Sequence, residues 1–278
     1  MKIIVYLLLT LTILLTISCE DYYGEKPEEI IPTEVILWGN VYSVESTDSL
    51  NISSLEENEL TGTIPSTIGY LTNLRYLNLE DNELTGVIPA SIGNLTNLTY
   101  LNLMDNRLTG AIPASIGNLI NLNHLDLDHN YLSGSIPSSI GNLNSLTYLN
   151  LGDNPFTGSI PQEICNLVNL NFLDISDSYE RGGSLGGLIP TEIGNLINLT
   201  SLRLDGNFLT GPIPPGIGDI INLRELILMG NQLSGELPQS ICNLTNLRYC
   251  FLQYNQFCPP YPSCVEDYLE YQDISQCN

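Results

Sequence analysis

Residues Leu71–Asn94 read LTNLRYLNLEDNELTGVIPASIGN, and nearly the same text returns at Leu95 and again at Leu119. A fixed period of 24 residues indicates a solenoid, in which one small unit stacks on copies of itself. Nine copies can be placed in register over residues 47–255, and the copy that starts at Leu167 has 29 residues instead of 24. Function is therefore expected in columns of equivalent residues.

Each copy carries a strand, a turn and a returning arc. Residues Tyr76–Leu79 alternate between outward positions and leucines, the pattern of a strand with one buried face. Gly86 suits a turn, and Pro89 fixes a dihedral and removes a donor, so the arc is not the interior of a helix. One copy cannot bury its apolar face alone. We therefore predict an α/β solenoid of about nine coils with one parallel β-sheet.

The first copy fits the pattern least well. Its start at Thr47 places Ser53 at the position of Leu77 and Ile52 at the position of Tyr76. A degenerate terminal copy is expected, because it must cover an exposed end of the core.

An asparagine recurs at one offset in most copies. A buried primary amide can donate two hydrogen bonds and accept others, so it can satisfy backbone groups of its own coil and of the next. We predict a structural amide column, broken at Ser178 in the longer copy. Its members are Asn58, Asn82, Asn106, Asn130, Asn154, Asn207, Asn231 and Asn255.

These residues resemble the leucine-rich repeat pattern L-x-x-L-x-L-x-x-N-x-L. The continuation L-T-G-x-I-P-x-x-I-G-x-L resembles the plant-type subclass, found in polygalacturonase-inhibiting proteins and receptor-like kinase ectodomains. The resemblance implies a right-handed curved superhelix with the parallel sheet on its concave face. It also implies an extra short strand near the L-T-G-x-I-P stretch, and recognition as the general role.

The N-terminus reads as an export signal. Residues 1–18 hold an apolar stretch after Met1-Lys2 that is short for a membrane span and suits a signal peptide. Cys19 after a small residue resembles the bacterial lipobox, which implies acylation at Cys19 and a lipid anchor in a bacterial membrane. The alternative is ordinary cleavage nearby, which leaves Cys19 as a thiol. Residues 19–46 are interpreted as a tether and a degenerate N-terminal cap.

The remaining cysteines gather at the C-terminus. An exported chain is expected to oxidise them, and residues 256–278 are interpreted as a Cys-containing cap. The spacing favours bridges among Cys242, Cys258, Cys264 and Cys277, with Cys250 as a buried thiol. Cys165 and Cys242 occupy equivalent places three coils apart and are not expected to bond each other.

The chain is strongly acidic, with a formal net charge of −23. Nucleic-acid binding is disfavoured, because phosphate contacts need lysine and arginine. The acidity serves either solubility or attraction of cationic partners or divalent cations. We expect a monomer that contacts a membrane only through a lipid at Cys19.

The outward positions of the strands define the candidate binding surface. One position is aromatic in five successive copies, and we call this set the aromatic column: Tyr76, Tyr100, His124, Tyr148 and Phe172. Tyrosine is frequent at binding hot spots. The alternative is that cross-strand stacking serves only the sheet.

Polar residues flank the aromatic column on the same predicted face: Asn102, Asp126, Asp128, Asp153, Asp174 and Arg203. The set Asp126, Asp128 and Asp153 is an alternative Ca²⁺ site, and His129 beside them admits acid–base chemistry. Catalysis needs a cleft that excludes water, and an open sheet has none. We therefore assign no catalytic residue, metal or cofactor.

Two further areas are candidates for contact. The longer copy carries an insertion whose residues Tyr179, Glu180 and Arg181 are expected at the rim of the face. Near the C-terminus the face becomes more apolar, at Ile227, Met229, Phe251 and Tyr254.

The sequence thus predicts a non-catalytic extracellular recognition module that binds a protein or glycan through the concave face. Two alternatives stay open. One is an inhibitor of a secreted glycoside hydrolase or protease, and the other is a structural or adhesive surface protein.

Overall fold

The computed structural model describes residues 31–53, 60–178, 182–269 and 271–277, and Pro32–Asn278 forms a compact unit of its own. The signal segment, Cys19, Asn58 and the rim residues Tyr179, Glu180 and Arg181 lie outside the described residues. Within the described ranges no helix is long and apolar enough to cross a membrane.

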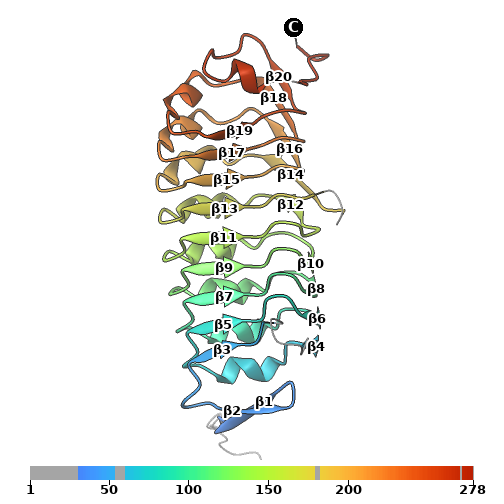
Figure 1. Ribbon diagram of the computed structural model, residues 1–278, viewed down its shortest axis with the longest axis vertical. Coiled ribbons are helices and arrows are strands. Elements are labelled where there is room, and N and C mark those ends of the chain that lie inside the picture. Colours follow the sequence, from blue (N-terminus) through green and yellow to red (C-terminus); the bar gives the residue numbers. More distant parts are fainter. Residues whose placement is uncertain (1–30, 54–59, 179–181, 270, 278) are drawn as a thin grey trace, which may run out of the picture. The chain divides into compact units, whose positions relative to one another are not determined.

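One parallel sheet of nine strands runs through the whole stack (Figure 1). Each strand places a residue opposite its equivalent in the next coil, such as Leu77 opposite Leu101. The central residue of each strand is buried, and its two neighbours face the other way. We call the surface that they form the strand face. The strands are β3 (Ser49–Asn51), β5 (Tyr76–Asn78), β7 (Tyr100–Asn102), β9 (His124–Asp126), β11 (Tyr148–Asn150), β13 (Phe172–Asp174), β15 (Ser201–Arg203), β17 (Glu225–Ile227) and β19 (Tyr249–Phe251).

A second row of short strands follows the first in each coil, where the family resemblance implied it. It forms a four-stranded and a five-stranded sheet, joined by a bridge between Gly134 and Phe156. The strands are β4 (Thr61–Thr63), β6 (Glu83–Gly86), β8 (Arg107–Gly110), β10 (Tyr131–Leu132), β12 (Thr157–Ser159), β14 (Ser184–Leu188), β16 (Phe208–Gly211), β18 (Gln232–Glu236) and β20 (Gln256–Cys258).

Short 3₁₀ helices return the chain to the next strand, and in the repeated coils each begins after a proline. The glycine of the I-G-N tripeptide has a steric cause. A Cβ on Gly93 would lie 2.4 Å from the carbonyl oxygen of Ser115 in the next coil. The helices are η1 (Ser66–Tyr70), η2 (Ala90–Asn94), η3 (Ala114–Asn118), η4 (Ser138–Asn142), η5 (Gln162–Asn166), η6 (Thr191–Asn195), η7 (Pro215–Asp219), η8 (Gln239–Asn243) and η9 (Glu266–Tyr268).

The amide column links successive coils as predicted. Asn106 Nδ2 donates to the carbonyl oxygens of Leu79 at 2.8 Å and Leu103 at 3.1 Å, and its Oδ1 accepts from the N–H of Leu84 at 3.0 Å. In the longer copy the buried Asp177 precedes Ser178, and its Oδ2 accepts from the N–H of Gly183 at 3.2 Å. The insertion therefore forms a hydrogen bond of its own beside the position where the amide is missing.

The register of the first copy differs from the one inferred from sequence. Leu50, not Ser53, lies opposite Leu77, and Ser49, not Ile52, lies opposite Tyr76. The separation in this copy is 27 residues, as between Asn51 and Asn78. Leu50 is only 5% exposed, so burial of a leucine in the core, rather than a constant period, sets this strand.

Both ends of the stack are covered. At the N-terminus the antiparallel hairpin of β1 (Glu34–Leu37) and β2 (Asn40–Ser43) buries Val35 and Leu37. At the C-terminus disulfides join Cys242 to Cys264 and Cys258 to Cys277. The predicted set of bridging cysteines is therefore confirmed, and Cys165 and Cys250 are free and buried.

Candidate ligand-binding face

The aromatic column is a continuous stack of rings across five strands. Centroid separations are 4.4 Å for Tyr76–Tyr100, 4.3 Å for Tyr100–His124, 4.2 Å for His124–Tyr148 and 4.5 Å for Tyr148–Phe172. Neighbouring planes differ by 14° or less. Strand pairing produces this stack, because each ring sits directly opposite the next in a parallel register.

Stacking determines what the rings can offer a ligand. Each inner ring has both faces covered by its neighbours, so only ring edges and phenolic hydroxyls remain toward solvent. A sugar that binds by laying its C–H groups on a ring needs an open face. The inner part of the aromatic column therefore suits hydrogen bonding and edge contacts.

The imidazole in the column is held neutral. Burial lowers the pKa of His124 to about 4, because a charged ring between Tyr100 and Tyr148 would lose its hydration. Burial also raises the pKa of Tyr148, with the charge of Asp126 acting in the same direction.

The C-terminal end of the column is closed by a cation. The Cζ atom of Arg203 lies 5.8 Å from the centroid of the Phe172 ring, on the side where the next strand carries only Ser201. Arg203 Nη2 forms an ion pair with Glu225 Oε2 at 2.8 Å, and Ser201 Oγ donates to the same oxygen at 2.9 Å. This guanidinium is thus held in place against the ring.

The polar residues beside the column are buried and build the turn after each strand. Asn102 Oδ1 accepts from the N–H of Met104, Asp126 Oδ1 from Asp128 and Asp174 Oδ1 from Ser176. Burial raises the pKa of Asp126 to about 6 and also raises that of Asp174. Of the predicted ligand-binding residues, these three therefore have at least one oxygen engaged within the fold.

In the turn after β9, His129 bridges two carboxylates. His129 Nδ1 lies 2.8 Å from Asp128 Oδ2, and His129 Nε2 lies 3.2 Å from Asp153 Oδ2. Burial opposes a charge on His129, but the hydrogen bond and charge of Asp128, with the charges of Asp153 and Asp105, outweigh it, so the pKa of His129 is raised. One ligand atom from each of the three side chains lies within 4.8 Å of the others. Of the residues that the sequence grouped here, the structure therefore brings together His129, Asp128 and Asp153, and Asp126 is not part of this cluster.

A polar hollow of about 270 Å³ continues this edge of the face toward the second row of strands. Asp81, Asp105 and His129 have positive φ values of 55°, 51° and 51°, a conformation that aspartate tolerates better than most residues. Sequence reasoning missed this hollow, although an Asp in the same place of successive copies was a readable signal. Its lining includes Asp81, Glu83, Asp105, Arg107, His129 and Tyr131.

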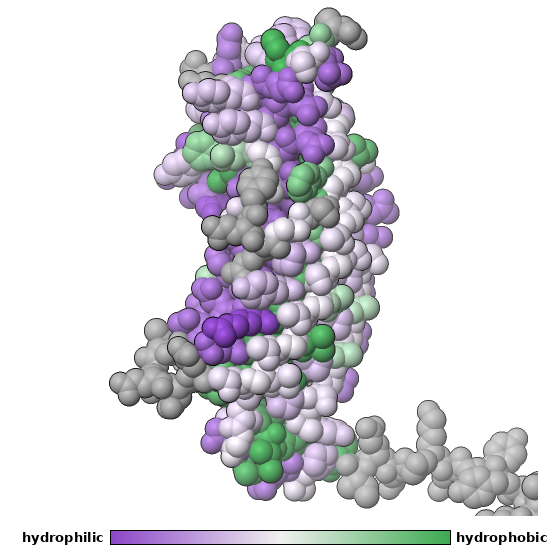
Figure 2. Space-filling model, turned by 90° about the vertical axis from the view of Figure 1, so that its right-hand side faces the viewer, coloured by the Kyte–Doolittle hydropathy of each residue, from purple (hydrophilic) through white to green (hydrophobic). Residues whose placement is uncertain are grey.

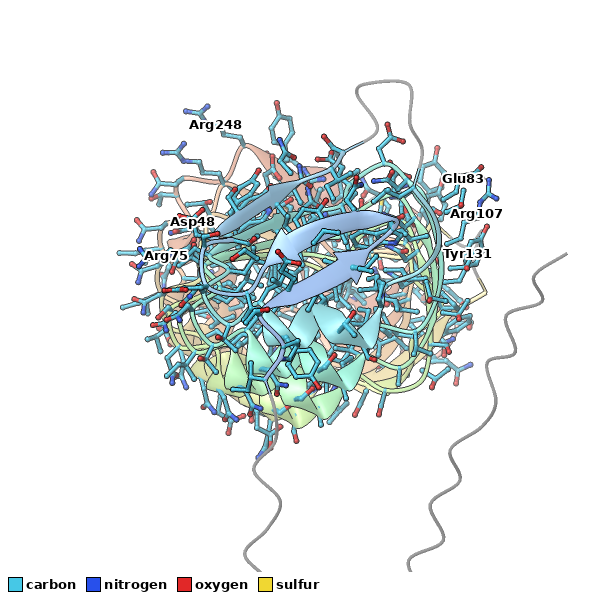
Figure 3. All side chains as sticks on the ribbon, turned by 90° about the horizontal axis from the view of Figure 1, so that it is seen from below. Asp48, Arg75, Glu83, Arg107, Tyr131 and Arg248 are labelled. Carbon is cyan, nitrogen blue, oxygen red and sulfur yellow. A yellow bond between two sulfur atoms is a disulfide. The ribbon has the colours of Figure 1, made fainter. Side chains whose placement is uncertain are left out.

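The opposite edge, where the strands begin, carries arginines and amides. Figure 3 shows Asp48, Arg75 and Arg248 at this edge and Glu83, Arg107 and Tyr131 at the other. A hollow of about 340 Å³ here is lined by Asn171, Asn198, Thr200, Asn222, Arg224, Asn246 and Arg248. Both edges of the strand face carry both signs of charge, but arginines prevail where the strands begin and carboxylates prevail where they end.

The apolar area at the C-terminal end of the face is solvent-exposed. Tyr249, Phe251 and Tyr254 are 53%, 39% and 56% exposed, and the Tyr254 ring stacks on Tyr271 with centroids 5.5 Å apart.

Solved structures similar to this chain include plant proteins. One is the ectodomain of the plant membrane receptor kinase GASSHO1/SCHENGEN3 from Arabidopsis thaliana, in complex with CASPARIAN STRIP INTEGRITY FACTOR 2. It is 37% identical to this chain with a TM-score of 0.74, and the match covers 81% of this chain and 26% of that one. The plant peptide hormone receptor RGFR1 in complex with RGF2 is 41% identical with a TM-score of 0.71, over 77% and 34%.

A plant ice-binding protein is 29% identical with a TM-score of 0.60, over 76% of this chain and 66% of that one. The chain thus matches only about a quarter to a third of the length of the two receptor ectodomains. No curated protein matches it.

A family model described as a leucine-rich repeat region matches residues 39–180 and 137–260. These ranges span most of the chain and include the coils that carry the aromatic column. The protein therefore belongs to the leucine-rich repeat family.

Proposed function

We propose that this protein is a non-catalytic extracellular recognition module that binds an extended segment of a protein partner across the strand face. One observation carries the proposal. A rigid row of ring edges and hydroxyls lies between an edge rich in carboxylates and an edge that carries arginines. Such a face offers hydrogen-bond partners and both signs of charge to a peptide.

A protein ligand is favoured over a glycan by the stacking itself. The ring faces that a sugar would cover are occupied within the column, whereas three of its five members carry hydroxyls: Tyr76 and Tyr100 on adjacent strands, about 4.8 Å apart, and Tyr148 two strands further on. The stack is ordered before a ligand arrives, so binding needs little ordering of the face. The receptor ectodomains GASSHO1/SCHENGEN3 and RGFR1 were each solved with a partner bound, which supports the same general role.

Attachment at the cell surface is part of the proposal. The two disulfides are in keeping with an exported chain, and acylation of Cys19 would anchor it in a bacterial membrane. Mass spectrometry of the native N-terminus tests this: a diacylated or triacylated Cys19 supports the anchor, and an unmodified or absent Cys19 refutes it.

The function is tested by capturing partners from the native cell surface. The bait is the exported chain, and the test variant carries Tyr100→Phe and Tyr148→Phe, which keep the stack and remove two hydroxyls. A second variant, Ile120→Thr with Ile221→Thr, changes exposed residues away from the strand face as the matched control. Loss of a captured protein from the Phe variant alone supports the proposal.

If the unmodified chain, the Phe variant and the control variant capture the same proteins, the partner does not bind through the hydroxyls of the aromatic column. The identity of the partner also decides between the alternatives. A captured glycoside hydrolase or protease would indicate an inhibitor. Concentration-dependent self-association in sedimentation experiments would indicate an adhesive role.

Ice binding is a second candidate, suggested by the plant ice-binding protein and by one regular feature of this chain. A row of hydroxyl side chains runs along the second row of strands. Figure 2 shows a pale band of near-neutral residues along this flank. The hydroxyl side chains of the row are those of Thr61, Thr85, Thr109, Ser133, Thr157, Thr210 and Ser234. Thermal hysteresis that disappears in a Thr85→Tyr, Thr109→Tyr variant would support ice binding, and its absence in the unmodified chain would exclude it.

A further inference from the structure

We propose that the open N-terminal end of the aromatic column is a subsite for a guanidinium group of the partner, an arginine side chain seated on the free face of Tyr76 above Ser49. The inference rests on the proposed function, because it names the chemistry of one contact on the strand face.

The protein already contains one such contact between a guanidinium and an aromatic ring, at the other end of the column. At the C-terminal end of the column the strand after Phe172 carries the small residue Ser201, which leaves one ring face uncovered by a neighbouring side chain of the column. Arg203 fills that space with its Cζ 5.8 Å from the ring centroid. A guanidinium over an aromatic ring is attracted by the negative face of the ring.

The N-terminal end has the same arrangement without the cation. The strand before Tyr76 carries Ser49 directly opposite the ring, so a second small residue flanks the column. The position equivalent to Arg203 in this strand is Asn51, whose Oδ1 accepts a hydrogen bond from Asn78 Nδ2 at 3.0 Å. Ser49 and Asn51 are both exposed, and Asn51 is too short to cover the ring.

The sheet provides no further strand there. β3 is the last strand of the nine-stranded sheet, so no ring from a described residue of another coil extends the column past Ser49. Among the described residues, no aromatic side chain of the sheet therefore covers the outer face of Tyr76, while the inner rings present only edges.

Charge selects a cation over another aromatic ring as the occupant. The net charge is −23, and at this edge the exposed Asp48, which precedes Ser49, lies beside Arg75. The long-range field of the acidic chain favours a cationic ligand, and a planar guanidinium can stack on the ring while its N–H groups point outward. The contact at the other end of the column also uses arginine. We therefore assign the subsite to an arginine side chain in the partner peptide.

The test uses a minimal probe and its neutral isostere. N-acetyl-arginine methylamide is titrated into the exported chain with ¹³C-labelled tyrosine rings, and N-acetyl-citrulline methylamide serves as the matched uncharged probe. The expected result is a saturable shift of the Tyr76 ring signals with the arginine probe, and binding of the citrulline probe weaker by about tenfold or more.

Three variants make the result specific to the ends of the column. Asn51→Arg places an internal guanidinium where Arg203 stands at the other end, and should abolish the Tyr76 shift. Tyr76→Leu removes the ring and should abolish saturable binding. Arg203→Ala frees the face of Phe172 and should raise the number of probe sites from one to two.

Several outcomes would overturn the inference. Equal shifts with both probes, shifts spread over all tyrosines, or an Asn51→Arg variant that still responds would each show that no guanidinium site exists at Tyr76. Partner capture that still depends on Tyr100 and Tyr148 in that case would leave the proposed function intact. If the arginine probe shifts the Tyr76 signals but partner capture does not depend on Tyr100 and Tyr148, the guanidinium site stands and the proposed function fails.

Discussion

The imidazole of His124 lies 4.2 Å from the ring of Tyr148, centroid to centroid, with 14° between their planes. This contact makes the stack sensitive to pH. The folded-state pKa of His124 is lowered from 6.5 to about 4, so between these values the unfolded chain binds more protons than the folded chain. The contribution of His124 to stability is therefore full above pH 6.5 and declines as the pH falls toward 4.

Replacing His124 by Phe should remove this dependence. Phe keeps a flat ring for Tyr100 and Tyr148 to stack on and cannot take a proton. Urea unfolding at pH 7.5 and at pH 5 is expected to show a smaller loss of stability on acidification in His124→Phe than in the unmodified chain. An identical loss in both proteins would contradict the assignment of a neutral, buried imidazole.

Replacing Asp126 by Asn should stabilise the protein at neutral pH. Burial raises the carboxyl pKa from 3.8 to about 6, so the ionised form is disfavoured in the fold. The equivalent positions in neighbouring coils are already Asn102 and Asn150, which make the same turn. The expected gain is on the order of 1–2 kcal/mol at pH 7.5.

The gain from Asp126→Asn should shrink as the pH falls through 6. A raised folded pKa means that the folded chain binds the extra proton between pH 6 and 3.8, so the aspartate protein recovers stability there. Asn102→Asp is the reverse change at the neighbouring coil and is expected to destabilise at pH 7.5. If the gain in stability from Asp126→Asn is the same at pH 7.5 and pH 4, the charge of Asp126 is not its cause.

The register of the coils can be tested with two adjacent residues. Leu101 is fully buried, whereas Asn102 faces the strand face with its amide bonded to Glu80 at 3.0 Å. Leu101→Asp places a charge in the core and should prevent folding or cost several kcal/mol. Asn102→Asp keeps the turn acceptor and should cost about 1 kcal/mol. Similar urea midpoints for the two variants would show that the register is wrong.

The C-terminal cap should depend on its disulfides. Cys258 and Cys277 are joined across 19 residues, and changing both to Ser should cost about 3 kcal/mol by the usual loop-entropy relation. Cys165→Gly, which restores the residue of most other coils, is the control and should change stability little. Apart from Cys19, thiol labelling should find no reactive cysteine in the folded chain and two after unfolding, Cys165 and Cys250.

The repeat made most of the fold predictable. A leucine at most inward positions and an asparagine at most turns allowed eight of the nine strands, the amide column and the aromatic column to be placed by counting residues. Counting failed in the first copy, because Leu50 rather than a fixed period sets the strand. It placed His129 near Asp126, Asp128 and Asp153 but did not show that His129 contacts only Asp128 and Asp153 of these, since that contact depends on the positive φ at His129 and not on strand register.

The candidate site was predictable in composition but not in orientation. The sequence placed five aromatic side chains in one row, yet an outward ring can lie flat on the sheet or stand on edge. Stacking at 4.2–4.5 Å between centroids decides this, and it arises from close packing between neighbouring rings. The buried state of Asp126 and Asp174 was also hidden, because outward strand positions normally face water.

The spacing of the coils determines which residues of an extended partner can contact equivalent positions on the strand face. Neighbouring parallel strands lie about 4.8 Å apart, and an extended chain rises about 3.3 Å per residue. Two coils therefore match three residues of a peptide that runs along the stack, at about 10 Å each. The spacing of the strands and the rise of the peptide therefore match only at every third residue of the peptide. A protein built on this period would recognise spacing along its partner as strictly as it recognises the side chains themselves.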